Sequence, residues 1–341
     1  MDPILQSMFE ELARGDEVYL PSKFWQSYNQ KNVAQLDQEG LANIKQTVAQ
    51  NYFTWVIGRG TDQYNWLVKQ MQWWDWPLIR HGAKKFDPSS RLTQIQQSDL
   101  VLFTRMLWRV AERLDRECVL RNLEEPVEGN PFRFYWKGKL ISQDLANSVI
   151  EYYSIREHFT PAKEARVTIA ELGAGYGRNA FLFLKALPKC RYVIIDIPPS
   201  LFIAQNYLTQ VFPDKRAFKF RPFRNFASVE AEFQASDIAF LLPHQAAMLP
   251  AKCMDLFVNI SSLQEMTLDQ IRAYFRMIDF LTRGYFYSKQ WKVSENPHDR
   301  IVVRESDYLA LPHWRELYHR QARVQVAFFE AMYAIGTETL P

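Results

Sequence analysis

Apolar and polar positions follow one pattern early in the chain and another after about residue 165. Early apolar positions recur at helical spacing, as at Leu5, Met8 and Leu12. Later ones form short apolar runs that alternate with helical segments. This alternation predicts an α/β fold with a mostly parallel sheet, helices on both faces, and ligands beyond the carboxyl ends of the strands. A mainly helical region precedes it.

We divide the chain into a helical N-terminal domain, residues 1–130, and an α/β domain, residues 131–341. The helical domain would lie on the substrate side or form a dimer contact. Gly15 is expected to end its first helix, and residues 21–25 to open a second. Ser98 is a candidate N-cap for a long third helix. The apolar face of that helix would consist of Leu100, Phe103, Leu107, Val110 and Leu114.

Tryptophan is concentrated in the helical domain, which holds seven of the ten in the chain. Aromatic rings stack on sugars, so some of these residues could line a substrate groove. Packing in the core or between helices is the commoner use, and we predict it for most of them. The seven are Trp25, Trp55, Trp66, Trp73, Trp74, Trp76 and Trp108.

The α/β domain is expected to open with a strand and turn at 131–140 and a helix capped by Ser142. Gln143 and Asn147, four residues apart on that helix, share a face that either meets a ligand or is solvated. The remaining strands are predicted at 167–171, 192–196, 236–242, 254–260 and 285–290. Further helices are predicted at 178–187 and 200–211. A last helix is expected to begin after Thr267, its N-cap, and to end at Gly284.

A glycine-rich turn follows the strand 167–171 and leads into a helix. Three of the chain's 12 glycines, Gly173, Gly175 and Gly177, lie within five positions there. Because glycine has no Cβ, it can adopt positive φ and lets a ligand approach the backbone closely. Asp196 follows Gly173 by 23 residues, where an acid can accept hydrogen bonds from ribose hydroxyls. The turn and the acid predict a site for a nucleotide-like ligand.

The spacing of the glycines narrows the choice of ligand. The dinucleotide fingerprint G-x-G-x-x-G does not fit, because the third glycine comes one residue too early. Instead, Glu171-Leu-Gly-Ala-Gly-Tyr-Gly177 resembles the E/D-x-G-x-G-x-G signature of class I methyltransferases that depend on S-adenosylmethionine (SAM). A glycine turn in another α/β domain is the alternative. The resemblance implies a Rossmann-like class I methyltransferase sheet and SAM as the cofactor. Residues 323–333 could form a helix or a strand; we prefer a strand, which this class of fold adds antiparallel at the sheet edge.

The same resemblance implies which residues contact the cofactor. Asp196 would take the ribose, residues 242–245 would flank the adenine, and Asn259 and the residues after it would lie near the methyl group. The helix face of Gln143 and Asn147, taken from its spacing alone, is a candidate contact for the amino-acid end, with a solvated face as the alternative. The full set of expected cofactor contacts is Glu171, Gly173, Ala174, Gly175, Gly177, Asp196, Ile197, Gln245, Asn259 and Gln143.

A methyltransferase must align a nucleophile with the methyl group, and a sugar hydroxyl also needs a base to remove its proton. Glu265 and His244 are the candidate catalytic bases, since both follow strands of the predicted sheet. Glu265 has a structural alternative as an acid in the first turn of a helix, and His244 would lie on the adenine side. A metal on Asp255, Asn259 or Glu265 could instead acidify the hydroxyl, although nothing in the spacing requires one.

Longer stretches resemble a bacterial family of sugar O-methyltransferases. That resemblance implies, as the acceptor, a sugar hydroxyl of a glycan, nucleotide-sugar or glycosylated metabolite. The alternatives are a SAM-dependent methyltransferase of a non-sugar small molecule and a SAM-binding or assembly protein without turnover. The stretches are residues 21–25 with 40–45, 140–148, 171–179, 196–199 and 259–266.

Composition bounds the remaining choices. An apolar content of 48% supports a sizeable core, and a net charge of +3 is too mild to predict nucleic-acid binding. Residues 214–224 mix bases and aromatics; we prefer a strand with Phe218 and Phe220 inward over a basic rim or a nucleic-acid site.

The six histidines and three cysteines show no metal or disulfide spacing. Since neither a signal peptide nor a bilayer-spanning apolar run is apparent, we expect a cytoplasmic protein, with a homo-oligomer left open.

Overall fold

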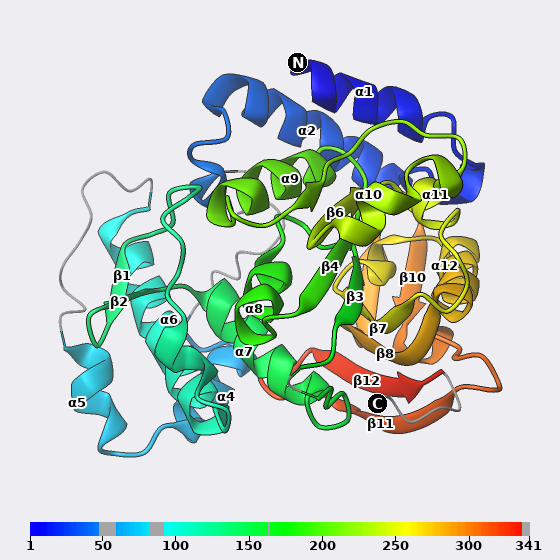
Figure 1. The fold of residues 1–341 in the computed structure, drawn as a ribbon. Helices are drawn as coiled ribbons and strands as arrows, with labels where there is room; N and C mark the ends of the chain where they lie inside the picture. Colours follow the sequence, from blue (N-terminus) through cyan, green and yellow to red (C-terminus); the bar gives the residue numbers. More distant parts are fainter. Residues whose placement is uncertain (48–58, 82–91, 163, 336–341) are drawn as a thin grey trace.

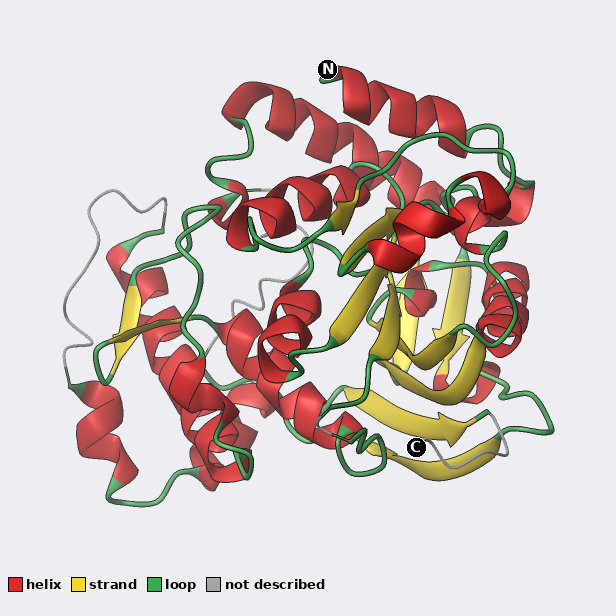
Figure 2. Cartoon of the chain, viewed as in Figure 1, coloured by secondary structure: helices red, strands yellow, loops and turns green. Residues whose placement is uncertain are grey.

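The central element of the structure is an eight-stranded sheet (Figures 1 and 2). This computed structural model describes residues 1–47, 59–81, 92–162 and 164–335. The strand order is β11-β12-β8-β7-β3-β4-β6-β5, and neighbours run parallel except that β12 is antiparallel to both β8 and β11. The predicted Rossmann-like α/β sheet is confirmed. The strands are β3 (Val167–Leu172), β4 (Cys190–Ile195), β5 (Ala217–Phe218), β6 (Ile238–Leu241), β7 (Met254–Ile260), β8 (Thr282–Trp291), β11 (Arg315–Gln321) and β12 (Phe328–Ala334).

Two details of the sheet correct the prediction. The antiparallel strand β12 does not form the edge, because β11 pairs with its outer side. Gly284 does not stop a helix: the helix before it ends at Leu281, and β8 begins at Thr282. The carbonyl of Gly284 accepts a hydrogen bond from the Ile335 amide at 2.8 Å, so this glycine belongs to the sheet.

Helices cover both faces of the sheet, and successive strand side chains enter two different apolar cores. Ile169 of β3 packs in the core on the side of α7, α8 and α9, whereas Ala170 and Leu172 pack in the core on the side of α10 and α12. Ser142 and Thr267 cap α7 and α12 as predicted. The helices are α7 (Gln143–Ile155), α8 (Arg178–Ala186), α9 (Ser200–Val211), α10 (Glu230–Ala235) and α12 (Leu268–Leu281).

The N-terminal helices lie in two places (Figure 1). One pair lies over the sheet end, with α1 packed against α9 and α2 beside it. The other group packs through α6 against α7. Residues 1–130 therefore approach the α/β part from two sides. The helices are α1 (Pro3–Leu12), α2 (Lys23–Glu39), α4 (Asp62–Gln70), α5 (Asp75–Arg80) and α6 (Gln94–Leu114).

Helix α6 begins earlier than predicted. Its N-cap is Thr93, which forms a reciprocal capping box with Gln96, so Ser98 lies inside the helix. The first turn is polar apart from Ile95, and Ile95 is 76% exposed. The apolar pattern therefore begins one turn after the helix does.

Smaller elements complete the fold. The predicted strand and turn at 131–140 form an antiparallel hairpin, and a second hairpin follows β8. Phe218 and Phe220 point inward as predicted, although β5 itself is short. No helix among the described residues combines the length and apolarity needed to cross a bilayer. These elements are β1 (Phe134–Trp136), β2 (Lys139–Ile141), β9 (Val293–Asn296), β10 (Ile301–Arg304), α11 (Pro243–Ala246), and the 3₁₀ helices η1 (Glu17–Tyr19), η2 (Ile44–Gln46), η3 (Val119–Asn122), η4 (Phe226–Ser228), η5 (Leu263–Glu265) and η6 (Glu305–Asp307).

The packing predicted for most tryptophans holds for only part of the set. Those in or against the core are Trp66, Trp76 and Trp108. Trp73 and Trp74 are 79% and 52% exposed, because they lie at the turn into the short helix α5. Trp25 lines a cavity described below. Trp55 lies outside the described residues.

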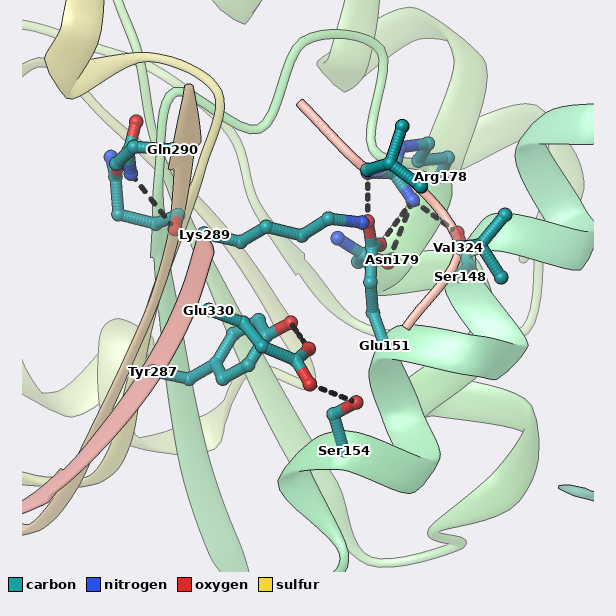
Figure 3. Close-up of polar contacts among 12 residues, drawn as sticks. Ser148, Glu151, Ser154, Arg178, Asn179, Tyr287, Lys289, Gln290, Val324 and Glu330 are labelled. Atoms are coloured by element: carbon teal, nitrogen blue, oxygen red, sulfur yellow. Dashed lines mark hydrogen bonds and ion pairs between the residues drawn. The ribbon is translucent and has the colours of Figure 1, made fainter. Parts of the chain in front are cut away.

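Buried polar contacts fasten α7 to the sheet (Figure 3). Lys289 of β8 and Arg178 of α8 both donate to the carboxylate of Glu151, at 2.7 and 2.6 Å. Burial alone would raise the pKa of Glu151, but the two cations more than offset it and leave that pKa lowered. Arg178 directly follows the third glycine, so this network also fixes the end of the glycine turn.

Candidate active site

The glycine turn joins β3 to α8 with three residues in the left-handed region. Gly173, Gly175 and Gly177 have φ of 71°, 59° and 90°, as predicted for them. Space is a second constraint: a Cβ on Gly173 would overlap the side chain of Ser262, and one on Gly177 would meet Leu208. The turn therefore needs glycine for its backbone shape and for its close approach to β7 and α9.

Asp196 follows β4 and lies beside this turn. Its two carboxylate oxygens accept hydrogen bonds from the backbone amides of Gly175, at 2.9 Å, and Ile197, at 2.8 Å. Burial raises the pKa of Asp196 to about 7, and these two amides oppose the rise. The acid and the turn predicted to act together are therefore in direct contact.

Glu171, the acid that opens the glycine motif, lies under the turn. It is 3% exposed and accepts hydrogen bonds from Asn179 at 2.9 Å and from the Tyr192 hydroxyl at 2.8 Å. Burial raises its pKa to about 7. Ala174 is buried in the turn, and neither residue is among those that line the cavity next described.

A cavity of about 860 Å³, partly open to solvent, lies over the turn; we call it the main cavity. Gly173, Gly175, Asp196 and Ile197 line it on the glycine-turn side. Residues that follow β7 form a second wall, namely Ser261, Ser262 and Glu265.

The third wall of the main cavity, here called the roof, comes from the N-terminal region. It consists of Tyr19, Leu20, Pro21, Ser22, Phe24, Trp25 and Tyr28. Ser22 donates to the Glu265 carbonyl at 2.7 Å, and Gln270 donates to the Leu20 carbonyl at 2.7 Å. Asp299 accepts from the Phe24 amide at 3.2 Å. These contacts fix the roof over the cavity, although hundreds of residues separate the partners.

Glu265 lies where the roof meets the wall from β7. Burial raises the pKa of its carboxyl well above the usual range; the Asp196 charge adds to this, and a hydrogen bond from Trp25 opposes it. Its Oε2 is buried and has no hydrogen-bond partner among the described residues. This oxygen can accept a proton from a group that enters the cavity.

Three predicted contacts lie elsewhere. His244 is buried against Glu11, with Nε2 3.6 Å from a carboxylate oxygen, and lines no part of the main cavity. Gln245 turns inward and donates to the Arg221 carbonyl at 2.9 Å; its neighbour Pro243 lines the cavity instead. Gln143 lines a second cavity of about 420 Å³, which it shares with Asp144 and Tyr176.

Asn259 supports the wall from β7 without lining it. Its amide donates to the Leu172 carbonyl at 2.9 Å and to Ser262 Oγ at 2.6 Å, which holds β7 against the turn. The oxygen set considered for a metal is not assembled, because Asp255 is at the start of β7 and pairs with Arg283. In the described part of the chain, no group of three or more His, Cys, Asp or Glu side chains is arranged to hold a metal ion.

Comparison with known proteins gives remote likenesses in structure. No protein-family model matches the chain, and no curated protein matches it in sequence. A SAM-dependent methyltransferase from Leishmania major is 15% identical, with a TM-score of 0.37, over 55% of this chain and 71% of the other. One from Aquifex aeolicus is 14% identical, with a TM-score of 0.33, over 55% and 97%. The Burkholderia thailandensis 1,6-didemethyltoxoflavin-N1-methyltransferase is 14% identical, with a TM-score of 0.36, over 56% and 77%. These likenesses are too remote to transfer an activity.

Proposed function

We propose that this chain is a SAM-dependent methyltransferase whose cofactor binds in the main cavity. The observation that carries the proposal is the contact between Gly175 and Asp196 at the base of that cavity. Glycines that bring bare backbone to a ligand, and an adjoining acid at a strand end, suit a ribose-bearing ligand. The overlap that a Cβ on Gly173 would make shows how closely this turn is packed.

Each wall of the cavity then has a task. Asp196 accepts from the ribose hydroxyls, the turn from Gly173 to Gly177 lies along the cofactor, and Ile197 and Pro243 pack beside the adenine. The bound cofactor supplies an electrophilic methyl group on a sulfonium. Ser261 and Glu265 lie on the wall where an acceptor would meet it. Gln143 would meet the amino-acid end only if the cofactor reaches past Tyr176, which lines the second cavity.

We further propose a sugar hydroxyl as the acceptor. The support is the pairing of aromatic rings in the roof with the partnerless oxygen of Glu265. Aromatic rings pack against the apolar faces of sugars, and a hydroxyl must lose its proton as it attacks. Ionised Glu265 would accept that proton at Oε2, while Trp25 holds the carboxyl in place.

Two measurements test the proposal. Purified protein is incubated with SAM and a panel of sugars, and products are analysed by mass spectrometry. One sugar should gain the mass of one methylene, and S-adenosylhomocysteine (SAH) should form in equal amount. If only a carboxylic acid is methylated, the enzyme acts on another small molecule, and Glu265→Gln should then barely change the rate, because a carboxylate needs no base. Absence of SAM binding by the wild type would refute the proposal.

A further inference from the structure

A groove of about 610 Å³ adjoins the main cavity; we call it the outer groove. Its lining residues are Phe24, Gln264, Glu265, Trp291, Val293, Ser294, Glu295 and Asn296. Phe24 and Glu265 line both spaces. The outer groove therefore meets the main cavity at the residue with the partnerless oxygen.

The walls of the outer groove are tied to one another and to the roof. The Gln264 side chain accepts from the Trp291 amide at 2.7 Å and donates to Ser261 Oγ at 3.0 Å. Asn296 donates to Asp299, which in turn accepts from the first amides of α2. The Trp291 ring lies against Phe328, with centroids 4.8 Å apart. The groove is thus built on β8 and the β9–β10 hairpin as a preformed site.

The chemistry of the lining limits what the groove can accept. Trp291 and Phe24 offer aromatic surface, and Ser294 offers a hydroxyl. The ionisable side chains among the described lining residues are both acids, Glu265 and Glu295, with no lysine or arginine beside them. A phosphate would need cationic partners, which the described lining does not supply, and the amides of Gln264 and Asn296 already donate to Ser261 and Asp299.

Two bases lie on or beside the strands of the groove. Lys292 extends to Gln321 on β11, with 3.0 Å between Nζ and Oε1, and Arg304 is exposed on β10. Neither lines the groove. The described lining therefore offers acceptor oxygens and no cationic side chain, which favours hydroxyl and ammonium donors over anions.

We infer that the outer groove is the acceptor site and that it takes a neutral or amine-bearing sugar ring in preference to a phosphorylated or nucleotide-linked one. This inference rests on the proposed function. The ring lies against Trp291 and Phe24, its donors face Ser294 and Glu295, and one hydroxyl reaches Glu265 at the junction. Methyl transfer there forms the O–CH₃ bond, breaks the S–CH₃ bond and moves the hydroxyl proton to Glu265.

The test compares methyl transfer to three matched glycosides: a neutral hexoside, its amino-sugar counterpart and its phosphate ester. We expect the wild type to prefer the first two. Glu295→Lys should shift kcat/KM toward the phosphate ester by about fivefold, the effect of one exposed charge pair. Glu164→Lys, an exposed change before β3, is the matched control and should leave the ranking unchanged.

Two results would overturn the inference: a wild type that prefers the phosphate ester, or a ranking that Glu295→Lys leaves unchanged. SAH binding, measured by calorimetry on the same samples, shows whether only the groove inference fails or the proposed methyltransferase function fails as well. Either of these results with normal SAH binding would overturn the inference about the groove alone. Loss of SAH binding by the wild type itself would remove the proposed function and this inference together.

Discussion

The backbone amide of Gly175 donates a 2.9 Å hydrogen bond to the carboxylate of Asp196. This contact joins the middle of the glycine turn to the end of the neighbouring strand, so neither can move independently. The second carboxylate oxygen is held by the Ile197 amide. Each oxygen of an ionised carboxylate can accept a further hydrogen bond, which leaves Asp196 able to bind ribose hydroxyls while fixed in place.

The first prediction concerns space at the glycine turn. Gly173→Ala should weaken SAH binding at least about tenfold and lower stability, because positive φ costs roughly 1–2 kcal/mol and the new Cβ overlaps Ser262. Gly138→Ala is the matched control, since Gly138 also has positive φ, 83°, but open space around it. Calorimetry and thermal unfolding measure the two effects.

The double variant Gly173→Ala with Ser262→Gly sharpens this test. Removing the Ser262 side chain removes the overlap but leaves the backbone strain, and it also removes the hydrogen bond that Asn259 donates to Ser262. Part of the stability should therefore return, but the double variant should stay less stable than Gly138→Ala because that control keeps the Asn259–Ser262 bond. If Gly173→Ala and Gly138→Ala lose the same amount of stability, close packing at Gly173 has no role.

The second prediction concerns the base. Glu265→Gln should lower kcat on a hydroxyl acceptor by about 10²- to 10⁴-fold, the range for loss of general-base catalysis. SAH affinity should change little. Because burial raises the pKa of Glu265 and only its ionised form can act as a base, wild-type kcat/KM should keep rising with pH above the usual titration range of a carboxyl group. That rise should vanish in Glu265→Gln; a variant with wild-type kcat would exclude Glu265 as the base.

The third prediction is the pH dependence of cofactor binding. Asp196 has a pKa of about 7 without ligand, and ribose donors favour its ionised form. SAH affinity should therefore fall as pH drops below about 7, by at most about tenfold per pH unit for a single proton. Calorimetry from pH 5 to pH 8 on wild type and Asp196→Asn isolates the contribution of the Asp196 proton. If SAH affinity depends on pH equally in both proteins, Asp196 does not control that dependence.

The fourth prediction concerns stability and Glu171. Its folded-state pKa, about 7, lies above the unfolded value, so its protonated form stabilises the fold below pH 4 and that contribution disappears as pH rises through 7. Glu171→Gln keeps the shape without the titration. The unfolding free energy of wild type relative to this variant should fall by on the order of 3 kcal/mol from pH 4 to pH 8. Urea unfolding at several pH values measures it, and a difference independent of pH would contradict the assignment.

Local patterns were sufficient to predict most of the sheet and the contact between the glycine turn and Asp196. The strand, glycine spacing and following acid lie within 30 residues of one another, so Gly173, Gly175 and Asp196 could be placed together from sequence. Thr267 and Ser142 were recognisable as caps because each precedes an apolar helical pattern. Thr93 was missed because its helix opens with a polar turn.

Long-range contacts could not be predicted in this way. Phe24, Trp25 and Tyr28 form the roof only because Ser22 reaches Glu265 and Gln270 reaches Leu20, across about 250 positions. His244 was placed by its strand alone, but the loop after α1 packs against it: a Cβ on Gly15 would meet its ring. The only local pattern that pointed to the roof was the pair Phe24 and Trp25 after Pro21-Ser22. That pattern does not indicate which surface the two rings cover.

The most direct test of the account is a calorimetric titration of SAH into wild type, Asp196→Ala and the exposed control Asp214→Ala. The account predicts saturable one-to-one binding by wild type and control. Binding by Asp196→Ala should be about 10- to 100-fold weaker, the worth of hydrogen bonds to a charged group. Failure of wild type to bind SAH, or equal affinity in Asp196→Ala, would contradict the claim that the main cavity holds this cofactor.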